Sequence, residues 1–310
     1  MKVSLISTVK NGSAHAEEFM GSVAGQTRAP DEVIVVDGGS TDGTPDLLRR
    51  AGVEVTTVIE ERGANIARGR NVAIAAAAHD VLAVTDADCV LDQQWLERIL
   101  EPIEAGADVS MGFYVPITDG FLQGCLASVN LPLDASGVDP ERFMPSARSI
   151  AFRRGALEAA GGYPEWLAIG EDMWVNRRWR ELGLDMRFAP EAVVRWRLRP
   201  TMRATWTQYF RYARGDAQAG MFPERHTLRF GVYAGGAAAL ASRRRWPKTI
   251  AAAGAVAYAR EPVRRAWRRL PDPRERIAAA IVVPAMMGWI DSAKMVGYAV
   301  GLADRGGDGR

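Results

Sequence analysis

The first half of the chain alternates short apolar runs with stretches of helical pattern, and this alternation constrains the fold more than any other feature. The strand-like runs are residues 3–8, 32–37, 53–59 and 81–84, and the helical stretches between them are residues 14–25, 44–50 and 64–78. Short β-branched runs separated by helices are typical of a parallel sheet that helices cover on both faces. The pattern therefore predicts an α/β domain built on a mostly parallel sheet.

Polar side chains follow three of these runs. Sheets of this kind bind ligands at the carboxyl ends of their strands, and Thr8, Asp37 and Asp86 stand at those ends. Asp37 also begins a glycine-rich segment, residues 37–44, whose glycines permit a tight loop. This segment has neither the dinucleotide-binding pattern nor the P-loop pattern. Taken alone, it also fits an ordinary connection between a strand and a helix.

Two carboxylates separated by one residue follow the run at 81–84. At this edge of a sheet Asp86 and Asp88 would hold a divalent cation, which in turn holds phosphate oxygens. The structural alternative is an aspartate-rich turn that caps the next helix. Their place directly after a buried strand favours the cation site.

A second acidic pair opens a predicted helix at residues 171–182, which Gly183 ends. The helix dipole favours acidic residues in a first turn, so capping explains Glu171 and Asp172 as well as a function does. The functional interpretation makes one of these carboxylates a general base at the mouth of a pocket.

In this order and spacing the three motifs resemble those of the family-2 glycosyltransferases, and the resemblance covers about residues 2–220. The matching stretches are residues 22–27, 31–44, 70–71, 85–88, 161–165 and 170–172. The resemblance implies a single Rossmann-like domain of the GT-A type, with a mixed, mostly parallel sheet and helices on both faces. It also implies an inverting enzyme that uses a nucleotide sugar.

The resemblance implies roles for five residues on the donor side. Thr8 and Asp37 would contact the nucleoside, with Asp37 on the base, and Arg70 would lie near the donor pocket. Asp86 and Asp88 would bind the donor through a divalent cation, Mg²⁺ or Mn²⁺, with Asp88 as the more direct ligand. A divalent cation stabilises a departing diphosphate as a Lewis acid.

On the acceptor side the resemblance implies that Asp172 is the catalytic base and takes the proton of the attacking hydroxyl. Glu171 and Trp174 lie on the same predicted helix and are candidates for contacts with the acceptor or the pyrophosphate. Gln208 and Arg211 are further candidates, because their segment resembles the Q-x-x-R-W element of membrane polysaccharide synthases, with Tyr in place of Trp. A single base opposite the leaving group predicts inversion at the sugar.

Charge divides the chain near residue 225. Residues 225–310 carry a net charge of +10 and residues 1–224 a net charge of −8, although the whole chain is close to neutral at +2. An acidic N-terminal part joined to a basic C-terminal part suggests that the two parts have different functions.

We therefore expect a catalytic domain at residues 1–225, followed by a basic and apolar helical region at residues 226–310. The donor half of the catalytic domain would occupy about residues 1–110 and the acceptor half about residues 111–225. The pattern of strands and helices is less regular in the acceptor half, which holds several Gly and Pro.

The C-terminal region combines apolar stretches with a basic run. The apolar stretches are residues 232–241, 249–259 and 277–302; the first two are too short to span a bilayer, and charged residues and a proline interrupt the third. The run at residues 260–276 holds seven arginines and Trp267. This combination favours helices in the interface of an anionic membrane over nucleic-acid binding, so we expect no nucleic-acid partner. A plain helical subdomain, an oligomer interface and true spanning helices are the alternatives.

The chain starts with a strand-like run and lacks the features of a signal peptide. We therefore expect the catalytic part at the cytoplasmic face of the cell membrane, or in the cytoplasm if the tail does not bind the membrane. Only two cysteines are present, which excludes a disulfide framework and a structural zinc site.

The leading hypothesis is a metal-dependent, inverting transfer of a sugar from a nucleoside-diphosphate sugar to an acceptor hydroxyl of a lipid-linked or cell-envelope glycan. A nucleotidyltransferase that makes an activated sugar is one alternative, but it predicts a glycine-rich signature after the first strand that residues 7–12 lack. A non-catalytic, membrane-associated scaffold of the same fold is the other, and it predicts loss of at least one of Asp86, Asp88 and Asp172, all of which are present. The sugar, the nucleotide, the acceptor and the oligomeric state stay open.

Overall fold

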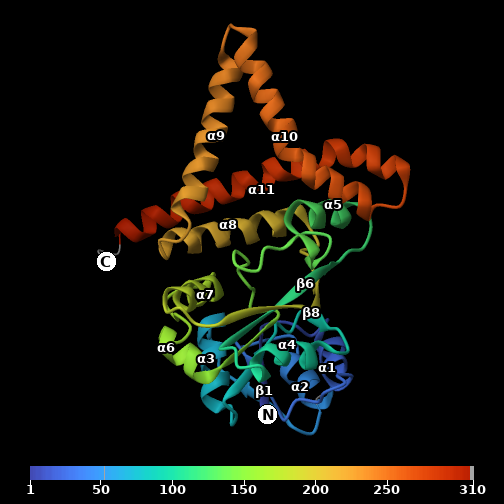
Figure 1. The fold of residues 1–310 in the computed structure, drawn as a ribbon, viewed down its shortest axis with the longest axis vertical. Helices are drawn as coiled ribbons and strands as arrows, with labels where there is room; N and C mark the ends of the chain where they lie inside the picture. Colours follow the sequence, from blue (N-terminus) through green and yellow to red (C-terminus); the bar gives the residue numbers. More distant parts are fainter. Residues whose placement is uncertain (52, 308–310) are drawn as a thin grey trace. The chain divides into compact units, whose positions relative to one another are not determined.

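A computed structural model describes residues 1–51 and 53–307. The chain forms two compact units. The first comprises Met1–Ile117 and Asp134–Arg197, and the second comprises Thr118–Leu133 and Leu198–Arg310. In Figure 1 the first unit holds the strands, and the second holds the long helices at the orange and red end of the chain.

The first unit is built on an eight-stranded mixed sheet in the order β3-β2-β1-β4-β7-β6-β8-β5. Its strands are β1 (Val3–Val9), β2 (Glu32–Asp37), β3 (Thr56–Glu60), β4 (Val81–Val84), β5 (Cys89–Leu91), β6 (Val109–Ile117), β7 (Ile150–Arg153) and β8 (Met186–Arg197). The four strands from β3 to β4 are parallel, as are β6 and β8, whereas β7 and β5 run antiparallel to their neighbours. The predicted α/β fold with a mixed, mostly parallel sheet is confirmed.

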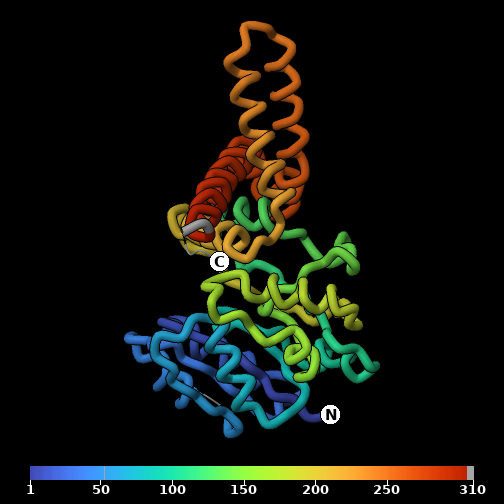
Figure 2. Tube along the Cα trace, turned by 90° about the vertical axis from the view of Figure 1, so that its left-hand side faces the viewer, coloured from blue at the N-terminus to red at the C-terminus, as the bar shows by residue number. Residues whose placement is uncertain are grey.

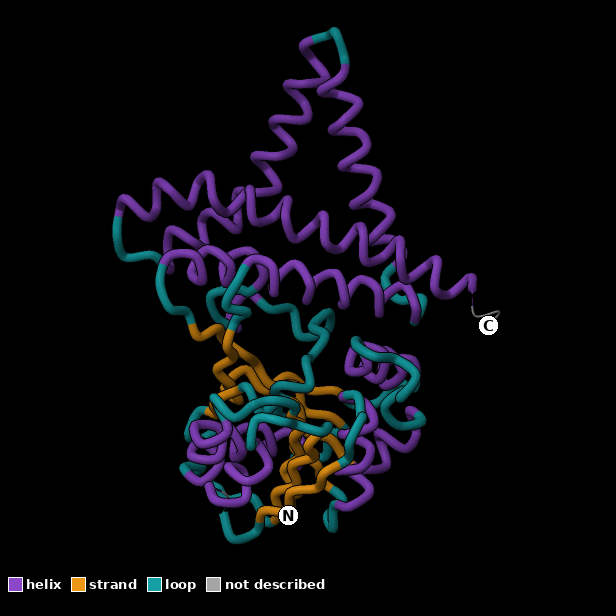
Figure 3. Tube along the Cα trace, turned by 180° about the vertical axis from the view of Figure 1, so that it is seen from behind, coloured by secondary structure: helices purple, strands orange, loops and turns teal. Residues whose placement is uncertain are grey.

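Helices cover both faces of this sheet, so that the strands lie between two helical layers (Figure 3). One layer holds α1 (Ala16–Ala24), α2 (Thr44–Ala51) and α4 (Trp95–Glu104), and the other holds α3 (Ile66–Ala76), α6 (Arg154–Ala160) and α7 (Glu171–Glu181). The second layer closes a core in which Phe152 of β7 packs against Trp179 of α7, with 5.2 Å between the ring centroids. This core fixes α3 and α7, which carry several of the predicted site residues.

The strands are hardest to recognise from sequence in residues 111–225, which supply three of the eight strands of the sheet. Residues 111–225 look irregular in sequence, yet they supply most of β6, all of β7 and β8, and four helices. The long strand β8 alternates buried and exposed side chains and contains Pro190, so it forms no continuous apolar run. The pairing of β6 with β8 also shifts register between Met111 and Phe113. The third predicted strand begins later than expected, at Thr56 rather than at residue 53.

Gly112 occupies that shift because no larger residue fits there. A Cβ at this position would lie 2.0 Å from Ser149 Oγ and 2.7 Å from the carbonyl oxygen of Ala192. The Ser149 hydroxyl is held in place: it accepts from Trp95 Nε1 at 2.8 Å and donates to that same carbonyl at 2.9 Å. Two strands (β6 and β8), α4 and the residue before β7 therefore meet at one polar contact inside the core.

The second unit is helical, which confirms the predicted helical extension. It contains α5 (Phe121–Asn130), α8 (Met202–Gln218), α9 (Pro223–Ala241), α10 (Arg245–Arg269) and α11 (Pro273–Gly307). The short 3₁₀ turn at Ala135–Gly137 belongs to the first unit. α11 packs along α8 and also contacts α5 and α10. α9 and α10 form a helical hairpin that turns at residues 242–244 (Figure 2).

Two details of this unit differ from the expectations. α11 continues as one helix through Pro284, Asp291 and Lys294, which therefore do not interrupt it. The compact units also divide at residue 197 rather than at 225, because α8 packs on α11. The functional boundary at 225 stays a prediction, and the last three residues of the predicted C-terminal region, 308–310, lie outside the described residues.

Candidate active site

Two loops at the carboxyl ends of β1 and β2 are tied together. Asp37, the last residue of β2, accepts hydrogen bonds at Oδ1 from the amides of Gly39 (2.9 Å) and Ser40 (2.7 Å), and at Oδ2 from the Ser40 hydroxyl. The Ser40 hydroxyl in turn accepts from the amide of Asn11 at 2.7 Å. A carboxylate has about four acceptor positions, so Asp37 keeps capacity for one further donor. Its contact with a nucleoside base stays a prediction.

Thr8 lies within β1, in register with Val36 of β2, and is partly buried. α3 approaches it closely at Gly69, where an added Cβ would lie 3.0 Å from the methyl group of Thr8. Thr8 and Asp37 thus stand at the ends of neighbouring parallel strands, as the sequence predicts. α3 packs beside Thr8 at this edge of the sheet.

Arg70 of α3 brings three segments of the first unit together. Its guanidinium is buried, donates to Asp86 Oδ1 at 2.9 Å and forms a short ion pair with Glu171 of α7. The ring of Tyr163 lies under it, with 5.3 Å from the guanidinium carbon to the ring centroid. The structure therefore brings Arg70, Asp86 and Glu171 to one place, although residues 70 and 171 are far apart in sequence.

Burial and charge act in opposite directions on this pair. Burial lowers the pKa of Arg70, but Glu171 and Asp86 outweigh that effect and raise it overall. Burial raises the pKa of Glu171 to about 6, against the opposing effect of Arg70. The Glu171 carboxylate is thus a buried partner of Arg70, in contrast to its neighbour in the chain.

Asp172 is that neighbour, and it is partly exposed. Its Oδ1 accepts from the amide of Met173 at 2.8 Å, and its Oδ2 accepts from the amide of Ala147 at 3.3 Å. Both contacts orient the carboxylate. Among the described residues, no positively charged side chain forms a hydrogen bond or ion pair with it. Trp174 follows it and packs against the core cluster on this face of the sheet.

Asp86 and Asp88 follow β4 and are both partly exposed. Asp86 is already held by two cations, since Arg148 Nε lies 3.7 Å from its Oδ2 while Arg70 holds its Oδ1. Within the described ranges no group of three or more His, Cys, Asp or Glu side chains could hold a metal ion by itself. Magnesium in proteins often takes only one or two carboxylates and completes its shell with phosphate oxygens and water. The donor set therefore fits a cation that arrives with a phosphate substrate and takes only one or two carboxylates from the protein.

Arg148 is a site residue that the sequence did not reveal. Its guanidinium stacks on Trp196, 4.2 Å from the ring centroid, and lies 5.6 Å from the ring centroid of Tyr114. It thus places a second positive charge beside Asp86. Nothing in its local sequence distinguishes it, because its position depends on the pairing of β6, β7 and β8.

Gln208 and Arg211 are the remaining candidates from the sequence. Both lie on α8, in the second unit, where Gln208 is buried and donates to the Tyr212 hydroxyl at 2.8 Å, and Arg211 is exposed. Their contact with pyrophosphate or acceptor stays a prediction.

Comparison with known proteins gives consistent matches. The family model described as glycosyl transferase family 2 matches residues 4–159. The glycosyltransferase AglE of Haloferax volcanii is 29% identical over 238 residues, which cover 73% of this chain and 76% of that protein. The O-antigen chain rhamnosyltransferase WbaN of Salmonella anatum is 26% identical over 218 residues, which cover 66% of this chain and 69% of that protein.

Two solved structures share the fold over the whole chain. One is residues 1–349 of TarS of S. aureus in complex with UDP, with a TM-score of 0.52, 15% identity and 92% of that chain covered. The other is the mannosyltransferase PcManGT of Pyrobaculum calidifontis in complex with GDP-Man and Mn²⁺, with a TM-score of 0.55, 19% identity and 88% of that chain covered.

The buried ion pair predicts a stability effect that depends on pH. In Arg70→Met, Glu171 loses its counter-ion, and we expect the free energy of unfolding to fall by about 3–5 kcal/mol at pH 8. Without Arg70 the pKa of Glu171 in the folded state rises further above its unfolded value, so protonation relieves the buried charge and the loss shrinks as the pH falls toward 5. Urea unfolding at several pH values measures this.

The matched control is Arg68→Met on the same helix, because Arg68 forms an exposed ion pair with Glu61. Its cost should stay below about 1 kcal/mol at every pH. In the double variant with Glu171→Gln the pH dependence of the Arg70→Met loss should disappear. Equal losses for the two arginine variants would contradict the structural role of Arg70.

Proposed function

The chain belongs to glycosyl transferase family 2, and on that premise we propose that it moves a sugar from a nucleoside-diphosphate sugar to an acceptor hydroxyl with inversion at the anomeric carbon. The observation that carries the proposal is the difference in environment between two adjacent carboxylates. Glu171 is buried against Arg70, whereas Asp172 is partly exposed and oriented by backbone amides. Asp172 is therefore the candidate base for the acceptor hydroxyl.

The chemistry of the transfer needs a proton acceptor on one side of the sugar and charge stabilisation on the other. Asp172 takes the proton of the attacking hydroxyl as the bond to the anomeric carbon forms, and the bond to the diphosphate breaks on the opposite face. One base and a direct displacement invert the configuration. Arg70 and Arg148 provide positive charge beside Asp86, on the side we assign to the diphosphate.

We also propose that a divalent cation, Mg²⁺ or Mn²⁺, binds with the donor to Asp88 and Asp86. When bound, it would stabilise the charge of the departing diphosphate as a Lewis acid. PcManGT, with which the chain shares its fold, was solved with GDP-Man and Mn²⁺. Thr8 and Asp37, at the ends of β1 and β2, are the candidate contacts of the nucleoside.

For the acceptor we propose a lipid-linked or cell-envelope glycan. The relative WbaN is described as an O-antigen chain rhamnosyltransferase, which supports an envelope glycan as the acceptor class. The proposed location is the cytoplasmic face of the cell membrane, where the second unit would provide the contact.

The hairpin of α9 and α10 supports this membrane contact. Its arms are apolar and mostly exposed around their circumference over residues 230–241 and 249–258, with Leu240 at 69% and Val256 at 70% exposure. A helix that is apolar all round needs an apolar environment. Arginines flank both arms, at Arg229 and Arg260 toward the base and at residues 243–245 at the turn. Because each arm is too short to span about 30 Å of hydrocarbon, we propose that the hairpin lies in the interface.

α11 is a weaker candidate for membrane contact. It is, over the described ranges, the one helix long and apolar enough to cross a membrane, and 39% of its apolar window is buried. Its buried side chains, among them Val283 and Ile290, belong to the packed interior of the second unit. We therefore assign it a structural role.

The base is tested by Asp172→Asn, which keeps the shape and removes the proton acceptor. A panel of UDP-, GDP- and dTDP-sugars with Mn²⁺ or Mg²⁺, read out as released nucleotide, first identifies the donor. We then expect kcat to fall by about 10²–10⁴-fold while donor affinity barely changes. Asp46→Asn, at an exposed position of α2, is the control and should behave as the unchanged protein. A loss seen mainly in donor affinity would instead support a capping role for Asp172.

The cation is tested by Asp88→Ala. We expect turnover to be lost and donor affinity to fall when Mn²⁺ is present, because the carboxylate would link the cation to the protein. Asp80→Ala, at the other end of β4 where the side chain is 97% exposed, should leave both unchanged. Turnover that survives both Asp88→Ala and chelation by EDTA would remove the cation from the proposal.

The membrane contact is tested by sedimentation with anionic liposomes. We expect the full chain to bind at low salt and to bind more weakly, but still measurably, at high salt, since charge and apolar burial both contribute. Replacing Val232 and Val256 together by Glu should abolish the salt-resistant part without unfolding the protein, because both side chains are exposed. Val55→Glu, at an exposed position of the first unit, is the control. A full chain that fails to sediment even at low salt would overturn the proposal.

A further inference from the structure

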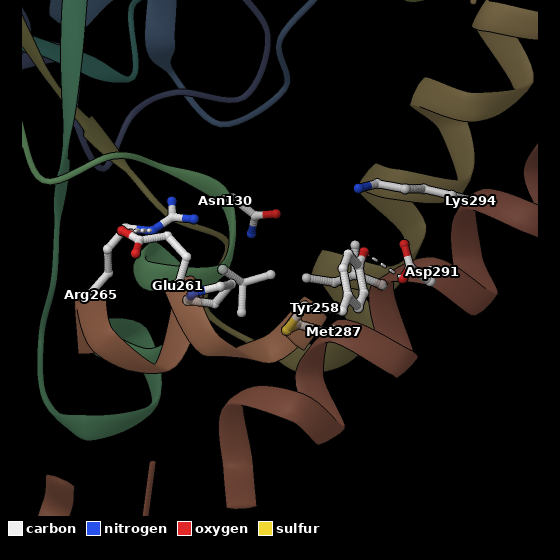
Figure 4. A pocket seen from close by; sticks show the side chains of 10 residues that line it. Asn130, Tyr258, Glu261, Arg265, Met287, Asp291 and Lys294 are labelled. Atoms are coloured by element: carbon white, nitrogen blue, oxygen red, sulfur yellow. Dashed lines mark hydrogen bonds and ion pairs between the residues drawn. The ribbon is translucent and has the colours of Figure 1, made fainter. Parts of the chain in front are cut away.

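The second unit contains a polar cavity that has no part in the proposed transfer. Its volume is about 260 Å³, and residues of α5, α10 and α11 line it. Figure 4 shows Lys294 and Arg265 extending from opposite sides, with the amide of Asn130 between them and Tyr258 and Asp291 nearby. A cavity with convergent polar groups inside a helical packing is a candidate binding site.

Lys294 lacks a polar partner in this cavity. Its ammonium lies 4.8 Å from the ring centroid of Tyr209, and among the described residues it forms no hydrogen bond and no ion pair. Burial, together with the positive charge of Arg229, lowers the pKa of Lys294 to about 8. A largely desolvated ammonium without an acceptor costs free energy, so an anion in the cavity would relieve that cost.

The nearby carboxylate of Asp291 is already held by three donors. It accepts from Arg229 Nε at 2.9 Å, from the Tyr233 hydroxyl at 3.0 Å and from the Tyr258 hydroxyl at 2.9 Å. These donors come from α9 and α10, and they hold the charge of Asp291 on the side of the hairpin. Asp291 is therefore the ion-pair partner of Arg229, and among the described residues its carboxylate forms no hydrogen bond or ion pair with Lys294.

Arg265 adds a second cation, whose hydrogen-bond donors are not all used. Its Nη1 donates to the carbonyl of Leu131 at 2.9 Å, but its Nε is buried and makes no hydrogen bond within the described part of the chain. The carboxylate of Glu261 lies 3.8 Å from that Nε and is largely exposed. Two incompletely satisfied cations therefore line one cavity, a combination that suits a phosphate group.

The place of the cavity along the hairpin indicates what the phosphate is attached to. Tyr258 lines the cavity and is also the last residue of the apolar arm at 249–258. The exposed face of α10 then changes to Arg260, Arg264 and Trp267, side chains that favour the headgroup level of a membrane. A ligand with its phosphate in the cavity would thus have an apolar surface beside it.

We propose that this cavity binds the phosphate headgroup of an anionic phospholipid, with Lys294 and Arg265 on the phosphate and the acyl chains along the exposed arms of α9 and α10. The inference rests on the proposed membrane contact and gives it chemical specificity. It is independent of glycosyl transfer, so each of the two proposals can fail alone.

The experiment measures the thermal unfolding midpoint of the full chain with dihexanoyl-phosphatidylglycerol below its micelle concentration. We expect a saturable rise, because a ligand that binds only the folded state stabilises it. Lys294→Met should weaken binding about 10- to 100-fold, the effect of losing a charge-assisted hydrogen bond. Arg264→Met removes the same charge from an exposed position of α10 and should bind like the unchanged protein.

Two further arms identify the source of the phosphate. Inorganic phosphate should bind at least tenfold more weakly than the lipid, and equal affinity would overturn the lipid assignment in favour of a free anion. Lys294→Gln repeats the test in case the Met variant folds poorly without ligand. Absence of a shift for the unchanged protein, or equal shifts for it and both Lys294 variants, would overturn the proposal. Sedimentation with liposomes is scored separately, so a failed pocket is distinguishable from a failed membrane contact.

Discussion

The candidate site depends on one buried cation. The guanidinium of Arg70 holds Glu171 of α7 and Asp86 after β4, and the ring of Tyr163 lies against it. Removing this charge would leave a carboxylate inside the core without compensation. Adjacent residues of a helix point about 100° apart, so fixing Glu171 on Arg70 also fixes the direction of Asp172. The same interaction that stabilises the unit therefore orients the carboxylate that we propose as the base.

The parts of the fold that sequence alone predicts are those whose signal is local. The runs at residues 32–37 and 81–84 coincide with β2 and β4, because strands buried on both faces are apolar at every position. Motifs of a few residues single out Asp86, Asp88 and Asp172 as candidates. They do not single out Arg148, since its place beside Asp86 is set by the pairing of β6, β7 and β8, which joins distant segments.

In the second unit, too, the sequence does not reveal contacts that join distant segments of the chain. In sequence, Asp291 and Lys294 look like breaks in an apolar segment, yet both lie within the continuous helix α11. Asp291 is buried because its partners Arg229, Tyr233 and Tyr258 reach it from α9 and α10. No pattern within α11 records those partners. Hydropathy therefore marks the apolar arms of the hairpin, which are exposed, but carries no information on how α11 packs against the other helices of its unit.

The order of the chain has a consequence for synthesis. α5 leaves the first unit between β6 and β7, yet it packs on α10 and α11, which are made last. At about 5–20 residues per second, its partners follow only about 10–35 s later. During that interval the sheet can close around β6 and β7 while the face of α5 that carries Cys125 and Leu126, buried in the finished protein, has no cover. A ribosome that stalls before α10 and α11 are made would thus leave the apolar face of α5 exposed on an otherwise folded first unit. Chaperones bind surfaces of this kind.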